Sequence, residues 1–314
     1  MKYNARVSQL NDPLLVNAKY TTNRLFAWVS YKAQMSSEVN RTDSTVNEQR
    51  NLQRSSSPRT SAVFLAETRK QADVAKKPFA VFDIDGTLIR WQLYHAVVDR
   101  LAKKGLLGNH AHEKLKEARM VWKRREYEDA FNDYQEILVK IYEKALPNIP
   151  VDKFHQIVDE IAGEYKEQIY TYTRDLIYAL KKQNYFLIAI SGSHKELISH
   201  IAQQYKFDEW VGTEYKHSNN RFTGERFLAS SYKEKILRKI VTKHNLEFKD
   251  SYGIGDSSSD IPILEMVENP IAFNPDKELF AHALSQKWKV IVERKNVIYE
   301  LNYKNGKYEL DLAK

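Results

Sequence analysis

Two carboxylates placed two residues apart are the most distinctive chemical feature of the sequence, in the segment DIDGT at residues 83–87. Asp83 and Asp85 follow the apolar run 79–82, which is typical of a short strand buried on both faces. Carboxylates on a turn that leaves the carboxyl end of such a strand can converge on one small volume, where open α/β sheets bind ligands. One carboxylate can then attack a substrate while the other exchanges protons.

Two later segments supply groups that suit a bound phosphate. The tripeptide SGS at 191–193 ends a second apolar run and offers a hydroxyl and exposed backbone amides ahead of a helix predicted over 194–205. Lys233 begins a helix predicted over 233–244 and can place its ammonium beside a phosphate. Lys235 is a rival for this role, but Lys233 fits better with the apolar positions of the helix. Taken singly, each segment is also compatible with an ordinary helix cap or an exposed lysine.

A fourth segment, GIGDSSSD at 253–260, lies between a predicted strand and a predicted helix. It brings Asp256 and Asp260 to the same edge of the sheet, although alone it is also compatible with a Gly/Asp/Ser turn. Oxygen ligands from these loops suit Mg²⁺, which would offset the repulsion between an anionic nucleophile and an anionic phosphate. The four segments together indicate phosphate chemistry at one end of a sheet.

Composition limits the remaining options. The chain has 314 residues, of which 42% are hydrophobic, and it has no cysteine, so thiolate zinc sites and cysteine nucleophiles are excluded. No run approaches the roughly 20 apolar residues of a membrane-spanning helix, so the sequence predicts a protein without a membrane span, located in the cytoplasm. The net charge of +8 resides mostly in residues 1–78, which hold thirteen Lys or Arg against six acids. A nucleic-acid partner is not predicted from so local an excess, and no oligomeric state is predicted.

Changes in residue composition and apolar pattern along the chain indicate three regions. Residues 1–77 are basic and rich in Ser and Thr, and we expect a disordered extension. Residues 78–90 and 171–314 alternate apolar runs with helical stretches, which indicates βαβ units and a mostly parallel sheet, with a β-hairpin over 213–227. Residues 91–170 are charged and helical with little Gly or Pro, and we expect an all-helical subdomain inserted after the first strand.

In this order and on these elements, the four segments resemble the motifs of the haloacid dehalogenase-like phosphatase superfamily. The resemblance covers residues 79–295 and extends to the phosphoserine phosphatase-like branch, in which a helical cap follows the first motif. It implies an α/β fold with a doubly wound, Rossmann-like, mostly parallel sheet and an all-helical cap. It also implies a Mg²⁺-dependent phosphomonoester hydrolase that acts on a small phosphorylated substrate through an aspartyl-phosphate.

The resemblance implies a role for each matching residue. Asp83 would be the nucleophile, Asp85 the general acid/base, and Lys233 the group that offsets charge in the transition state. Mg²⁺ would be held by Asp83, by the backbone carbonyl of Asp85 and by Asp256. Thr87, Ser191 and Gly192 would bind phosphoryl oxygens. Asp260 would position Lys233 or a metal-bound water.

One position departs from the family pattern. Phosphoserine phosphatases that resemble this chain have a glutamate nine residues after the nucleophile, where it pairs with the serine ammonium, and here the residue is Gln92. A neutral amide weakens the case for an amino-acid phosphate. Groups that bind the leaving group would come from the helical insertion, with candidates at Trp91, Tyr94, Arg119, Trp122, Arg124, Arg125 and Tyr127.

Two other functions fit parts of the sequence. A phosphotransferase of the same fold would use an acceptor alcohol in place of water at the aspartyl-phosphate. A polyanion-binding protein would rely on the basic residues of the first 78 positions, since basic tails bind polyanions. That segment nevertheless has few of the interleaved basic and aromatic residues typical of a nucleic-acid platform.

Overall fold

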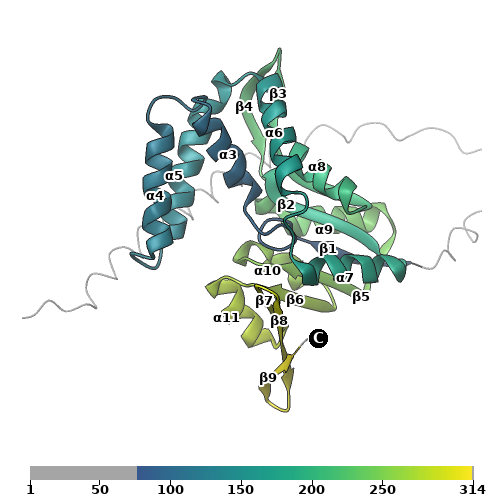
Figure 1. The fold of residues 1–314 in the computed structure, drawn as a ribbon. Coiled ribbons are helices and arrows are strands. Elements are labelled where there is room, and N and C mark those ends of the chain that lie inside the picture. Colours follow the sequence, from purple (N-terminus) through teal and green to yellow (C-terminus); the bar gives the residue numbers. More distant parts are fainter. Residues whose placement is uncertain (1–75, 313–314) are drawn as a thin grey trace, which may run out of the picture. The chain divides into compact units, whose positions relative to one another are not determined.

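A sheet of nine strands runs through residues 76–312, the part of the chain that the computed structural model describes. The strands lie in the order β4-β3-β2-β1-β5-β6-β7-β8-β9 (Figure 1). Their bounds are β1 (Lys77–Phe82), β2 (Phe186–His194), β3 (Glu209–Ser218), β4 (Arg221–Phe227), β5 (Leu246–Gly255), β6 (Asn269–Phe273), β7 (Lys289–Arg294), β8 (Val297–Lys304) and β9 (Lys307–Leu312). In this order, each neighbouring pair from β3 through β7 is parallel. The pairs β4–β3, β7–β8 and β8–β9 are antiparallel. The predicted α/β fold with a mostly parallel sheet is confirmed.

Helices cover both faces of this sheet. Their bounds are α3 (Leu93–Lys103), α4 (Ala111–Arg124), α5 (Ala130–Ala145), α6 (Val151–Tyr165), α7 (Thr171–Lys182), α8 (Lys195–Gln204), α9 (Lys233–Lys243), α10 (Ile261–Leu264) and α11 (Lys277–Gln286). Successive side chains of β1 point to opposite faces, so Ala80 and Phe82 belong to one apolar cluster and Phe79 and Val81 to another. The first cluster includes residues of α7 and α8, and the second includes residues of α9 and α10.

The order of the strands fixes where a ligand can bind. β1 lies between β2 and β5, and the chain leaves it on one side to form β2 and returns later on the other side as β5. In open α/β sheets, the carboxyl ends of strands at such a reversal form the ligand crevice. The loops after β1, β2 and β5 therefore meet at this point.

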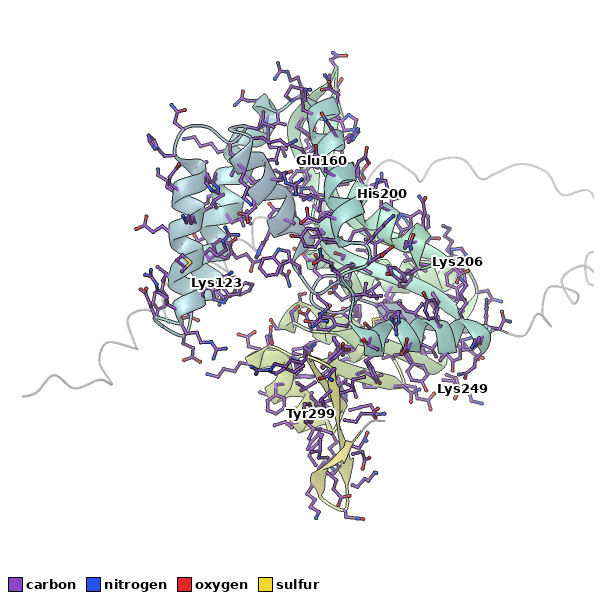
Figure 2. All side chains as sticks on the ribbon, viewed as in Figure 1. Lys123, Glu160, His200, Lys206, Lys249 and Tyr299 are labelled. Atoms are coloured by element: carbon purple, nitrogen blue, oxygen red, sulfur yellow. The ribbon has the colours of Figure 1, made fainter. Side chains whose placement is uncertain are left out.

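Helices α3 to α6 follow β1 and precede α7, where the sequence predicts a helical insertion over 91–170. The β3–β4 hairpin holds one end of this group of helices: the Asn220 carbonyl and side chain accept the amides of Val151 and Asp152 at 3.2 and 3.0 Å. Arg226 pairs with Glu143 of α5 at 2.7 Å. His200 on α8, labelled in Figure 2, also contacts α6 through Asp159 at 3.0 Å. Whether residues 91–170 act as a separate cap remains a prediction, because they share one compact unit with the sheet.

Three features differ from the sequence analysis. The first strand begins at Lys77, one residue before the predicted boundary, and residues 1–75, on which the tail and polyanion hypotheses depend, lie outside the described part. β2 continues through His194, so α8 begins one residue later than predicted. The β8–β9 hairpin at the sheet edge was not predicted. Within residues 76–312, no helix has the length and apolar composition that crossing a membrane requires.

Candidate active site

Four chain-distant segments meet at the carboxyl ends of β1, β2 and β5. Asp83 directly follows β1, and its amide donates to the Ile254 carbonyl of β5 at 2.9 Å, which fixes the start of the loop. Asp256 directly follows β5, and Ser191 lies near the end of β2. Lys233 is the first residue of α9 and is buried. The structure therefore brings together all four segments that the sequence singled out.

A buried ion-pair network connects Lys233 to two of the carboxylates. Its ammonium donates to Asp83 Oδ1 at 2.7 Å and to Asp260 Oδ1 at 2.5 Å. Burial alone would lower the pKa of Lys233, but the charges of Asp260 and Asp83 raise it above its ordinary value. The lysine therefore stays cationic at neutral pH. A fixed cation here can stabilise negative charge that develops on a bound phosphoryl group.

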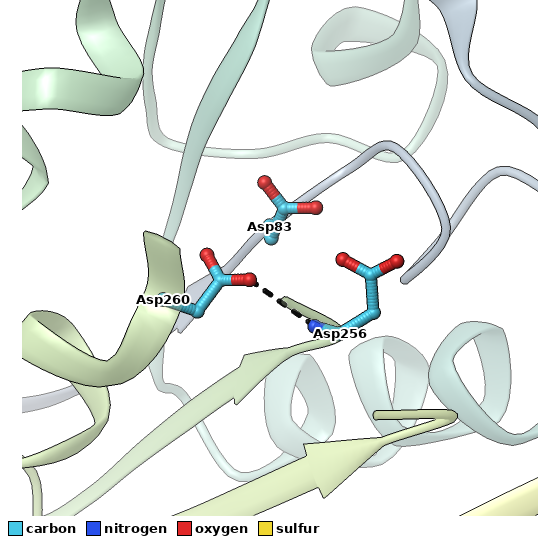
Figure 3. Close-up of side chains that lie close together, drawn as sticks. All are labelled: Asp83, Asp256 and Asp260. Carbon is cyan, nitrogen blue, oxygen red and sulfur yellow. Dashed lines mark hydrogen bonds between the residues drawn. The ribbon is translucent and has the colours of Figure 1, made fainter. Parts of the chain in front are cut away.

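Asp260 positions the lysine and the loop that carries Asp256. Its Oδ2 atom accepts the amides of Asp256 at 3.2 Å and Ser257 at 3.0 Å, and the first of these bonds is drawn in Figure 3. Ser257 and Asp260 form a capping box at the start of the helical turn that follows. Both oxygens of Asp260 are thus occupied by the protein. Asp260 therefore lies beside Lys233, the position that was predicted for it.

Asp85 occupies a different environment, on the side of the site that faces β2 and α3. Its Oδ2 atom accepts the Ser191 hydroxyl at 2.7 Å, and its Oδ1 atom accepts the Leu93 amide at 2.5 Å. Burial raises the pKa of Asp85, and the hydrogen bonds from Ser191 and Leu93 partly oppose the rise. A carboxyl group with a raised pKa is suited to donate and accept a proton near neutral pH.

Three carboxylates form a group that can hold a metal ion. One oxygen each from Asp83, Asp256 and Asp260 lies within 4.8 Å of the others, and Figure 3 shows the three side chains converging. Burial raises the pKa of Asp256 well above its ordinary value, and the neighbouring Asp83 and Asp260 raise it further. A divalent cation would relieve this repulsion, and the all-oxygen donor set suits Mg²⁺ or a similar hard ion. Because Asp260 is bonded to Lys233 and to backbone amides, Asp83 and Asp256 are the better ligands.

Gly86 makes room for the Asp256 carboxylate. Its φ is +79°, and a Cβ atom added there would lie 1.9 Å from Asp256 Oδ2. We expect Gly86→Ala to displace Asp256 and to lower kcat/KM about 100-fold, the scale of a 1 Å displacement in an active site. The dependence of the rate on Mg²⁺ concentration would also shift to higher concentration.

Gly105→Ala provides the matched control for this prediction. Gly105 has a similar φ of +75°, but an added Cβ would have no atom within 4 Å. Both variants carry the same backbone strain, so steady-state kinetics at several Mg²⁺ concentrations isolate the contact with Asp256. Equal activity losses in the two variants would contradict the assignment.

The predicted phosphate-binding residues lie around the same volume. Thr87 is fully buried, and its hydroxyl has no hydrogen-bond partner among the described residues, while its carbonyl accepts the Thr173 hydroxyl at 2.9 Å. The Gly192 carbonyl accepts the Thr213 hydroxyl at 2.7 Å, which holds this residue in place. The prediction of exposed amides over 191–193 is wrong for Ser193, whose amide donates to Ser191 Oγ at 3.0 Å.

Sequence reasoning missed the Leu93 amide as a partner of Asp85. A backbone amide is present at every residue but proline, so no residue type could have indicated it. Most aromatic and basic candidates from the insertion are engaged elsewhere. Tyr94 stacks on His194 with ring centroids 5.0 Å apart, and Arg119 pairs with Asp99. The Tyr127 hydroxyl donates to Asp133 Oδ2 at 2.9 Å. Gln92 is different, because its amide nitrogen approaches Gly86 on the side of Asp256.

Comparison with known proteins identifies the family. Residues 80–265, more than half of the chain, match the family model of the haloacid dehalogenase-like hydrolases, and the chain belongs to that family. It is 27% identical over 223 residues to a histidinol-phosphatase of Neisseria meningitidis serogroup C (strain 8013), a match covering 68% of this chain and 98% of that protein. It is 21% identical over 231 residues to a phosphoserine phosphatase of Methanocaldococcus jannaschii, covering 73% and 98%.

A solved structure has the same fold. It is a protein of unknown function from Bordetella pertussis Tohama I, 20% identical, with a TM-score of 0.55 and coverage of 69% of this chain and 98% of that chain. The predicted family and fold class are therefore confirmed. The prediction of a phosphatase is confirmed as well, since the family comprises hydrolases and both curated relatives above are phosphatases.

Proposed function

We propose that the chain is a phosphomonoester hydrolase that acts through an aspartyl-phosphate on Asp83. The observation that carries the proposal is the pair of contrasting carboxylates. Asp83 is bound to the Lys233 ammonium at 2.7 Å, whereas Asp85 is bonded only to neutral donors, the Ser191 hydroxyl and the Leu93 amide. Burial raises the pKa of Asp83 to about 7, and the charge and hydrogen bond of Lys233 oppose that rise, so the lysine favours the ionised nucleophile. Within residues 76–312, no cation is hydrogen-bonded to Asp85, whose pKa burial also raises, and this suits a group that carries a proton.

These environments suit a two-step reaction. In the first step, an Asp83 oxygen forms a bond to phosphorus while the bond from phosphorus to the leaving oxygen breaks, and Asp85 gives its proton to that oxygen. In the second step, Asp85 takes a proton from a water molecule, and the water oxygen attacks phosphorus. The bond between phosphorus and the Asp83 oxygen then breaks, which releases inorganic phosphate and restores the Asp83 carboxylate. Lys233 offsets the charge on the phosphoryl oxygens in both steps.

Other residues of the site would bind the phosphoryl group and a metal ion. The unpartnered hydroxyl of Thr87 is a donor for a phosphoryl oxygen, as is the Gly192 amide. The carboxylates of Asp83 and Asp256 and the Asp85 carbonyl would hold Mg²⁺. When bound, this ion would offset the repulsion between the carboxylates and the anionic substrate.

The substrate we propose is a small phosphorylated metabolite. The relatives named above are a histidinol-phosphatase and a phosphoserine phosphatase, which supports a phosphorylated alcohol of that size. Gln92 approaches the site with a neutral amide. An amide pairs less strongly with an ammonium than a carboxylate does, so we expect weaker discrimination in favour of phosphoserine.

A panel of phosphomonoesters tests the proposed function. We expect the purified full chain to release inorganic phosphate from several small esters with Mg²⁺ and to lose this activity when EDTA removes the metal. Restoring Mg²⁺ should restore the rate. No release from any ester in the panel, or an unchanged rate in EDTA, would refute the proposal. Adding excess alcohol distinguishes a phosphotransferase, because only a transferase would yield mainly the transferred ester.

A further inference from the structure

The segment 191–193 leaves the regular ladder of the sheet. Its register with β3 shifts between Ile190 and His194, so these three residues lie opposite Gly212 alone. The pairing of β2 with β1 ends at Ala189, before the segment begins. Regular strand pairing therefore does not fix the backbone of residues 191–193, and other contacts have to hold it, as in a β-bulge.

A single buried hydroxyl on β3 supplies such a contact. Thr213 is only 1% exposed, and its hydroxyl donates to the Gly192 carbonyl at 2.7 Å. The same oxygen accepts the Ala229 amide at 3.3 Å. Ala229 begins the helical turn Ala229–Tyr232, which leads directly into Lys233 at the start of α9. Thr213 thus bridges the segment that carries Gly192 and the segment that carries Lys233.

This bridge is the hydrogen-bonded connection between the two segments. Within residues 76–312, no hydrogen bond joins residues 191–193 directly to residues 228–232. The backbone of β3 is itself tightly packed here, because a Cβ atom added at Gly212 would lie 2.7 Å from Lys195 Cα and 2.9 Å from the Ser193 carbonyl oxygen. Thr213 therefore stands on a fixed support and holds both segments to it.

We propose that Thr213 is a positioning residue, which sets the Gly192 amide and Lys233 at a fixed distance from each other. This inference rests on the proposed function, in which both groups contact phosphoryl oxygens. Asp83 and Asp260 hold the ammonium end of Lys233, and the Thr213 bridge holds its backbone end relative to Gly192. Charge that spreads over the phosphoryl oxygens in the transition state has to meet both donors at once, which requires donors that are already in place.

Removing the hydroxyl tests the role. Thr213→Val keeps the shape of the side chain but leaves the Gly192 carbonyl and the Ala229 amide without their partner. We expect kcat for p-nitrophenyl phosphate to fall about 10- to 100-fold, the upper value being the scale of a 1 Å displacement in an active site. KM should change little, because the displaced groups still attract the phosphate but no longer match the transition state. Thr213→Ser retains the hydroxyl and should keep most of the wild-type kcat.

Inhibition constants separate positioning from a loss of folded protein, because they do not depend on the amount of active enzyme. Orthovanadate adopts a five-coordinate form that resembles the transition state, whereas inorganic phosphate resembles the ground state. In Thr213→Val we expect the inhibition constant of vanadate to rise about 10- to 100-fold, in parallel with the loss of kcat, and that of phosphate to change much less. A merely structural role would lower kcat and the melting temperature and leave both constants unchanged.

Ser251→Ala is the matched control. Ser251 is also fully buried on a strand, and its hydroxyl makes the same pair of bonds, donating to the Phe248 carbonyl and accepting the Glu268 amide. This variant should lose melting temperature to a similar extent and keep wild-type kinetics and inhibition constants. Thr213→Ala, which places no methyl group beside the two polar atoms, serves if the valine variant does not fold.

The possible outcomes are distinct. Unchanged kinetics in the variants without the hydroxyl, a lower kcat with an unchanged vanadate constant, or an equal loss in Thr213→Ser would each overturn the inference. A wild type that vanadate does not inhibit would overturn it as well, because the donors would then not match the five-coordinate geometry. In all these cases the wild type would still hydrolyse the ester, and the proposed function would stand. If the wild type hydrolysed no ester, the proposed function itself would fail.

Discussion

Replacing Asp83 with Asn is expected to lower kcat for p-nitrophenyl phosphate by at least about 10⁴-fold, the scale seen when a nucleophile is removed. The amide keeps the size of the side chain but cannot form the acyl-phosphate bond. Lys233 keeps its second carboxylate partner, Asp260, at 2.5 Å, so the core of the site should remain assembled. Steady-state kinetics with Mg²⁺, together with a thermal melt of each protein, measure the effect.

Asp250→Asn is the control for the loss of one negative charge. Asp250 is exposed and lies within β5, several residues before the site, with a positive φ that asparagine tolerates well. This variant should retain wild-type kinetics. Substantial metal-dependent turnover by Asp83→Asn would contradict the assignment of the nucleophile.

Asp85→Asn has the second largest expected effect. The loss of the proton donor should lower kcat/KM for phenyl phosphate by about 10²- to 10⁴-fold, the usual range for general acid catalysis. The loss for p-nitrophenyl phosphate should be much smaller, because its leaving group departs without a proton. Since the amide that replaces the carboxylate could not deprotonate water either, the aspartyl-phosphate should accumulate during turnover of p-nitrophenyl phosphate.

The two esters and a burst of nitrophenolate check this prediction. A burst equal to the enzyme concentration, followed by slow turnover, would show that the first step still occurs and the second is blocked. Equal losses of kcat/KM for the two esters, without a burst, would contradict a general acid/base role for Asp85.

The sheet and the cluster at its edge were predictable because they depend on local patterns. Residues 79–82 form an unbroken apolar run, as a strand covered on both faces requires, and Asp83 follows directly. The same reasoning placed Asp256 after β5. Parallel strands bring their carboxyl ends to one edge, so residues far apart in sequence were expected to meet. Lys233 was distinguished from Lys235 by helical spacing, and the structure buries Lys233 with Leu237 and Ile240.

Other features depend on tertiary contacts that residue types do not indicate. The Leu93 amide reaches Asp85 only because α3 begins beside the loop after β1. The segment 191–193 was expected to expose its backbone amides to a phosphate, but the Ser193 amide donates to Ser191 Oγ in the irregular end of β2.

The β8–β9 hairpin was missed although its turn has a strong signal. Asn305 and Gly306 have φ values of 51° and 85°, as a two-residue type I′ turn requires, and Asn-Gly is the favoured pair for it. Tyr303 pairs with Tyr308 and Leu301 with Leu310, so apolar side chains face each other across the two strands. The hairpin lies at the edge of the sheet, away from β1, and its omission did not affect the site.

Acid quenching during turnover tests the central claim most directly. Asp85→Asn should be mixed with p-nitrophenyl phosphate and Mg²⁺, quenched in acid, digested and analysed by mass spectrometry. The account predicts one phosphoryl group on the peptide that contains residue 83, and none in the variant that also carries Asp83→Asn. An unmodified peptide throughout a measured burst, or a phosphoryl group on another residue, would contradict it.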